Sequence, residues 1–137
     1  MSVILNPYLS FCDNAREAME FYQTVFGGEL TVSTFRDFQM TQDESDLDKV
    51  MHSQLNGEAG IVLMAADTPS HMEYTPGSSI TVSLSGDDES TLRRHWDGLS
   101  EGASIVEPLE KAPWGDSFGM LVDRFGVGWM VNISGQG

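Results

Sequence analysis

The sequence has 137 residues, and its 21 acidic and 7 basic residues give a formal net charge of −14 at pH 7. Nucleic-acid binding needs positive side chains against the phosphates, so this charge argues against nucleic acid as a partner. The single cysteine excludes an internal disulfide, and we find neither a signal-peptide pattern nor the run of about 20 apolar residues that spans a membrane. We therefore expect one cytoplasmic domain without a membrane partner. Its acidic surface is either simply well solvated or attracts cationic small molecules.

The first half of the chain predicts one strand, one helix and three further strands. Alternating residues predict a strand over 3–11, in which Leu5 lies on the apolar face. A helix follows, capped by Asp13 or Asn14, with an apolar stripe that includes Phe21 and Tyr22. Further strands are expected at 29–36, 50–56 and 60–66, and loops at 37–49 and 67–78.

The second half repeats this pattern after a shift of 75 residues. Residues 79–85 alternate as a strand, and Asp88, which matches Asp13, caps a helix that carries Trp96. Strands are then expected at 103–110, 117–123 and 127–133, with Asp123 forming the turn before the last of them. The repeat predicts two modules, 1–67 and 79–137, joined by a loop over 68–78.

The last predicted strand has two different faces. Trp129, Val131 and other apolar residues fall on one side, which we expect to be core. Gly128, Met130 and Asn132 fall on the other side of the strand. A glycine, a flexible thioether and a polar amide suit the wall of a cavity better than a dry core. The sequence therefore predicts a pocket on this second face.

Five stretches of the sequence carry a family resemblance: PYLSF, AREAMEFYQTVFGGE, VMHSQL, SLSGDD and PWGDSFGMLVDRFGVGWMVN. With the tandem βαβββ pattern, they resemble the glyoxalase/bleomycin-resistance/extradiol-dioxygenase (vicinal oxygen chelate) superfamily, and in particular its PhnB-like branch. The resemblance implies an α+β fold, in which two βαβββ modules form a U-shaped mixed sheet with helices on the outside. It also implies that the concave face holds a small molecule and, in many members, a divalent metal.

The resemblance also says where a metal would be held. In metal-using members four ligands, usually His and Glu, lie on the first and last strand of each module. Carried over to this sequence, these positions fall on Asn6, Met64, Thr81 and Met130. Amide, hydroxyl and thioether groups carry no charge to offset the dehydration of a hard dication. We therefore expect no metal and no cofactor.

Two side chains of the first module could serve the pocket. His52 shares a strand face with Gln54 and Asn56, where it would be a donor or general base; the alternative is a structural strand histidine. Tyr8 projects with Asn6, and its phenol could bind a ligand oxygen. A core tyrosine with a satisfied hydroxyl is an equally good interpretation.

In the second module, Trp114 lies in a loop and either covers the cavity or closes the end of the sheet. Met64 and Met130 would form an apolar floor that accepts a ligand of imprecise shape, with Asn132 beside them. The remaining candidate, His95, is expected on the solvated flank of its helix.

These features lead to one main functional hypothesis and two alternatives. The main one is a protein that binds a small apolar or aromatic molecule without the metal quartet, and whether it is an enzyme stays open. The alternatives are a metal-dependent lyase, isomerase or dioxygenase of the same superfamily, and an antibiotic-sequestering resistance protein. We also expect a homodimer, because the edges of the sheet need covering.

Overall fold

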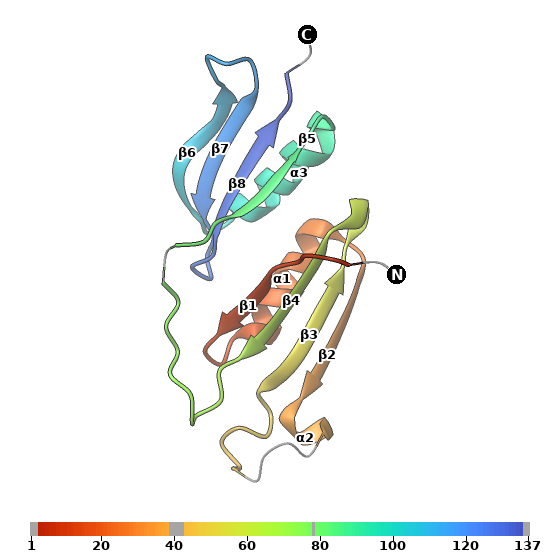
Figure 1. Cartoon of the computed structure of the whole chain (residues 1–137), viewed down its shortest axis with the longest axis vertical. Helices are drawn as coiled ribbons and strands as arrows, with labels where there is room; N and C mark the ends of the chain where they lie inside the picture. Colours follow the sequence, from red (N-terminus) through yellow and green to blue (C-terminus); the bar gives the residue numbers. More distant parts are fainter. Residues whose placement is uncertain (1–2, 39–42, 78, 136–137) are drawn as a thin grey trace. The chain divides into compact units, whose positions relative to one another are not determined.

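The computed structural model describes residues 3–38, 43–77 and 79–135. The chain divides into two compact units, Met1–Pro76 and Gly77–Gly137, and the boundary falls inside the segment expected to be a linker (Figure 1). Among the described residues, no helix is long and apolar enough to cross a membrane.

The first unit is a four-stranded mixed sheet with a helix against one face (Figure 1). The strand order is β1-β4-β3-β2, in which β1 runs parallel to β4 and the other neighbours are antiparallel. Tyr22 and Phe26 of the helix are fully buried together with Leu55 and Leu63 of the sheet. In chain order the elements are β1 (Tyr8–Phe11), α1 (Ala15–Phe26), β2 (Glu29–Thr34), α2 (Phe35–Phe38), β3 (Val50–Asn56), the 3-10 turn η1 (Glu58–Gly60) and β4 (Val62–Asp67).

The second unit has the same topology, with the strand order β5-β8-β7-β6. Its helix packs tightly on the sheet at Gly119, where an added Cβ would lie 2.8 Å from Cη2 of Trp96. Trp129 is fully buried, as expected for the core face of the last strand. The elements are β5 (Val82–Gly86), α3 (Glu89–Ser100), β6 (Ser104–Lys111), β7 (Ser117–Val122) and β8 (Gly128–Ile133).

Both units therefore follow the order strand, helix and three strands, which confirms the α+β class and the tandem βαβββ repeat. Tyr8 pairs with Met64 between β1 and β4, and Ser83 pairs with Met130 between β5 and β8. Tyr8 and Ser83 are 75 residues apart, which matches the shift found in the sequence, while their partners Met64 and Met130, each the third residue of its strand, are 66 residues apart. The U-shaped sheet that would combine the modules stays a prediction.

The predicted start of the first unit was wrong in two respects. The strand expected over 3–11 begins only at Tyr8, and Leu5 is 99% exposed rather than on an apolar face. Pro7 has no N–H to donate to a ladder, although its carbonyl still accepts from Met64 N at 3.1 Å. The side chain of Asn14 makes no cap bond, and a carboxylate from β4 takes that role: Asp67 Oδ1 accepts from Ala15 N at 2.9 Å.

The strand expected over 29–36 ends at Thr34, and the short helix α2 follows within what was predicted to be strand and loop. The change of structure is stabilised by a reciprocal pair of hydrogen bonds. Thr34 N donates to Asp37 Oδ2 at 2.8 Å, and Asp37 N donates to Thr34 Oγ1 at 3.2 Å. This is a capping box, and it ends the strand locally.

In the second unit, the strand expected over 79–85 is found at Val82–Gly86, and the predicted cap of α3 is confirmed. Asp88 Oδ1 accepts from Thr91 N at 3.1 Å and Asp88 Oδ2 accepts from Thr91 Oγ1 at 2.9 Å, and these hydrogen bonds lower the pKa of Asp88. His95, by contrast, is 1% exposed and not on a solvated flank. The buried face of α3 therefore includes His95 in addition to the apolar residues Leu92, Trp96 and Leu99.

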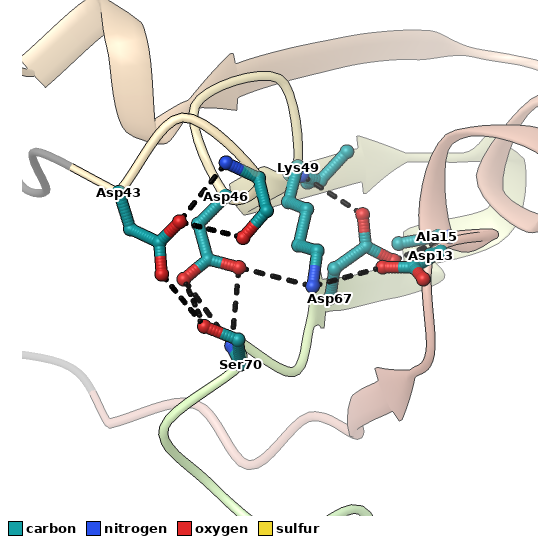
Figure 2. A network of polar contacts seen from close by, with 9 residues as sticks. Asp13, Ala15, Asp43, Asp46, Lys49, Asp67 and Ser70 are labelled. Carbon is teal, nitrogen blue, oxygen red and sulfur yellow. Dashed lines mark hydrogen bonds and ion pairs between the residues drawn. The ribbon is translucent and has the colours of Figure 1, made fainter.

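A polar network connects three loop segments of the first unit (Figure 2). Lys49 Nζ lies 3.2 Å from Asp13 Oδ1 and 3.0 Å from Asp46 Oδ1, and these contacts raise the pKa of Lys49. Asp46 is buried and accepts from both the backbone N and the hydroxyl of Ser70. The network thereby fixes the acidic loop before β3 to the segment that follows β4.

Candidate functional site

Each sheet has one face against its helix, and we call the opposite face the open face. Along β3, Ser53 and Leu55 are fully buried on the helix side, so His52 and Gln54 lie on the open face. Strand register then adds Tyr8, Thr31, Ser33 and Met64 to the open face of the first sheet.

Tyr8 and His52 form a pair on this open face. The Tyr8 hydroxyl lies 3.4 Å from His52 Nδ1, and the ring centroids are 5.9 Å apart. Tyr8 is 51% exposed and so is not part of the core of its unit, while partial burial raises the pKa of its hydroxyl. The phenol therefore stays protonated at neutral pH and can donate a hydrogen bond. Asn6 lies two residues before Tyr8 and is half-buried.

The open face of the second sheet is built around Met130 and Asn132. Trp129 and Val131 are fully buried on the helix side, which confirms the core face predicted for this strand. Thr81 lies just before β5, with its Oγ1 3.4 Å from the position of a Cβ added to Gly128. Two rows of paired residues cross the open face: Glu110, Phe118, Asn132 and Ser85 in one, and Glu107, Met120, Met130 and Ser83 in the other.

The loop between β6 and β7 adds two side chains to this face. Trp114 is 66% exposed and packs edge-on against Phe118, with ring centroids 6.2 Å apart. Asn132 Nδ2 donates to Asp116 Oδ2 at 3.0 Å, and Gly135 N donates to Asp116 Oδ1 at 2.8 Å. These two hydrogen bonds lower the pKa of Asp116, so its carboxylate stays charged at neutral pH.

A sequence comparison identifies the family to which this arrangement belongs. The family described as "Glyoxalase/Bleomycin resistance protein/Dioxygenase superfamily" matches residues 4–131, which include every strand of both units except the last residues of β8. The chain belongs to this superfamily. Protein YjdN from Escherichia coli strain K12 is 25% identical over 96% of both chains.

Several solved structures have a fold similar to that of this chain. The crystal structure of protein PA1353 from Pseudomonas aeruginosa is 36% identical, with a TM-score of 0.81 over 98% of this chain and 100% of that one. A Bacillus cereus structure titled "Putative 3-demethylubiquinone-9 3-methyltransferase, PhnB protein" has a TM-score of 0.70 at 23% identity, over 96% and 100% of the two chains. The fosfomycin resistance protein FosX from Listeria monocytogenes has a TM-score of 0.63 at 12% identity, over 98% and 94%, and thus shares the fold.

The structure allows a test of whether the superfamily's metal would fit this chain. Met64 and Met130 occupy equivalent positions, because each pairs with the first strand of its own sheet in the same register. In each unit the donor set carries no negative charge: a thioether sulfur with the amide of Asn6 in the first, and a thioether sulfur with the hydroxyl of Thr81 in the second. Among the described residues, no group of three or more His, Cys, Asp or Glu side chains lies close enough together to hold a metal. This donor set does not suit a hard divalent cation.

The eight candidate residues predicted from the sequence divide equally between the two units. Phe118 was missed, although alternation in SFGMLV places it on the same face as Met120. The contact between Asp116 and Asn132 was also missed, and no sequence pattern reveals it because the two are 16 residues apart. The first unit contains Asn6, Tyr8, His52 and Met64, and the second contains Thr81, Trp114, Met130 and Asn132.

Proposed function

We propose that this superfamily member binds a small apolar or aromatic molecule on the open faces of its sheets and uses no metal ion. The observation that carries the proposal is the chemistry of the four positions where relatives hold a metal. Asn6, Met64, Thr81 and Met130 offer hydrogen bonds and apolar surface there instead of charged ligands. The motif stretches quoted above support placing the chain in the PhnB-like branch.

A thermal-shift screen tests this function. Purified protein is screened against metabolites and antibiotics, with and without EDTA, and we expect compounds that raise the Tm equally under both conditions. Hits that are confined to antibiotics would favour the sequestering alternative. Hits that need added Zn, Ni, Fe or Mn would instead support the metal-dependent lyase, isomerase or dioxygenase and contradict the proposal.

The neutral donor set leads to a direct prediction about metal content. Protein purified without chelator and desalted should contain well below one equivalent of any transition metal, because three or more uncharged ligands do not repay the dehydration of a dication. Elemental analysis by plasma mass spectrometry measures this. One equivalent of Zn, Ni, Fe or Mn that survives desalting would show that other residues complete a site.

Met130→Glu tests whether the open face of β8 is in contact with solvent. Met130 is half-buried, so the new carboxylate should stay hydrated, and the loss should be only about 1–2 kcal/mol from forfeited apolar contacts. Val131→Glu is the matched control, since Val131 is fully buried on the other face of the strand and its substitution should prevent stable folding. Urea melts compare the variants. Equal destabilisation by both would mean that Met130 is core and that our open face is misplaced.

We also propose that the chain forms a homodimer. β1 and β2 are the edge strands of the first sheet, as β5 and β6 are of the second, and exposed edges invite pairing. Val3, Leu5 and Ile80, in the segments before β1 and β5, are more than 80% exposed. Such apolar side chains gain from being covered by a second copy. Light scattering after size exclusion should give twice the 15.1 kDa chain mass, whereas a 15.1 kDa species at micromolar concentration would rule the dimer out.

A further inference from the structure

The open face of the second sheet is apolar at its centre and negatively charged at one edge. Phe118 and Met130 lie in the middle strands, while Glu110, on the edge strand β6, pairs directly with Phe118. The paired open-face positions described above include no Lys or Arg. Lys111 is the basic residue of the β6–β7 hairpin. It pairs with Ser117, and Ser117 pairs with Ile133, which is buried on the helix side, so Lys111 belongs to a row on the helix side of the sheet.

Asp116 determines which way the amide of Asn132 points. A charged carboxylate only accepts hydrogen bonds, so the group that faces it at 3.0 Å must be the Asn132 NH₂, and Oδ1 is left as the acceptor that points away from Asp116. The second oxygen of Asp116 is held by Gly135 N, and Asp116 O accepts from Ala112 N in the turn between β6 and β7. No other hydrogen bond to the Asn132 side chain occurs among the described residues. The amide therefore presents Oδ1 as an acceptor of fixed orientation, while one N–H of Nδ2 is held by Asp116.

An aromatic surface lies next to this acceptor. Phe118 pairs directly with Asn132 across the two strands, and the Trp114 ring packs edge-on against Phe118. Trp114 is 66% exposed, which is unusual for a residue this large. A planar ligand ring placed on this surface would have its substituent within reach of Asn132 Oδ1.

We propose that this face takes a ligand with an aromatic body and a protonated amine head. The ring packs against Phe118, Trp114 and Met130, and the ammonium donates to Asn132 Oδ1 within the field of Asp116 and Glu110. The net charge of −14 adds a long-range attraction for cations. This inference rests on the proposed function, because it specifies the ligand of the same open face.

Four matched probes test the ligand class: 2-phenylethylamine, its N,N,N-trimethyl derivative, 2-phenylethanol and phenylacetate. Affinities are read from amide shifts of ¹⁵N-labelled full-length protein at β7 and β8. We expect the amine to bind best, the trimethyl derivative to be weaker because it has no donor, and phenylacetate to be weakest. Equal affinities, a preference for phenylacetate, or no shifts on this face would overturn the inference. The thermal-shift screen judges the proposed function separately, because its hits need not be amines.

Asp116→Asn tests the positioning role, and Asp97→Asn, an exposed change of the same charge on α3, is its control. Asp116→Asn should weaken the amine about tenfold and leave 2-phenylethanol within twofold, whereas Asp97→Asn should change neither by more than about twofold. Asn132→Leu should also reduce the preference for the amine over the alcohol. If Asp116→Asn weakens all probes alike, Asp116 has only a structural role and the inference fails.

Discussion

Replacing Asp67 with alanine should destabilise the first unit more than any change on its surface. Asp67 is 6% exposed, and its two oxygens accept from the backbone N–H groups of Ala15 and Val50, both at 2.9 Å. The carboxylate thus caps the N-terminus of α1 and fixes the start of β3. Alanine leaves two buried donors without partners at about 1–3 kcal/mol each, and the relief of a buried charge offsets only part of this. We expect a loss of about 3 kcal/mol.

Urea unfolding followed by far-UV circular dichroism measures this loss. The control is Asp48→Ala, because the Asp48 side chain is 84% exposed and pairs only at the surface with Arg36. That change should cost less than about 0.5 kcal/mol. A similar small cost for Asp67→Ala would show that water or a shifted backbone replaces the cap.

Replacing Asp123 with alanine should have a comparable effect on the second unit. Asp123 Oδ1 accepts from Phe125 N at 2.8 Å and Val127 N at 3.0 Å, which shapes the turn between β7 and β8. Its Oδ2 accepts from Nε1 of the fully buried Trp129 at 2.9 Å. Loss of the carboxylate removes the acceptor of a buried indole donor and of two turn amides, and we expect a cost of about 3–4 kcal/mol.

Tryptophan fluorescence reports this change selectively, since Trp96, Trp114 and Trp129 all belong to the second unit. Asp123→Asn is the informative comparison. Its remaining carbonyl oxygen can still accept from the two turn amides, so it should lose less than the alanine variant, mainly the bond to Trp129. Identical losses for the two variants would place the whole effect on the indole contact and none on the turn.

Much of the fold could be predicted because its signals are local. Strict alternation defines β8, and a single carboxylate, Asp88, caps α3 as its spacing to the helix indicates. Where prediction was wrong, a distant or competing contact decided the outcome. The cap of α1 comes from Asp67, 52 residues away from Ala15. The capping box of Thr34 and Asp37 is a local signal, by contrast. It was overlooked because the alternating pattern of the preceding strand continues through these residues.

The candidate site shows the same limit. Alternation assigned Met130 and Asn132 to one face because strand periodicity is a property of the backbone. It could not show that Asp116 holds the amide of Asn132, nor that Tyr8 of β1 and His52 of β3 meet over β4, which lies between their strands. Such contacts depend on sheet register, which only the assembled unit specifies.

The most direct test of the central claim is a chemical-shift map of the protein with the strongest thermal-shift hit. The ¹⁵N-labelled chain is treated with EDTA, desalted and titrated with that compound. With no metal added, we expect saturable shifts on the open face of a sheet, at positions such as Tyr8 and His52 in the first unit or Phe118, Met130 and Asn132 in the second. Shifts confined to α1 or α3, or binding that appears only after a divalent metal is restored, would contradict the central claim.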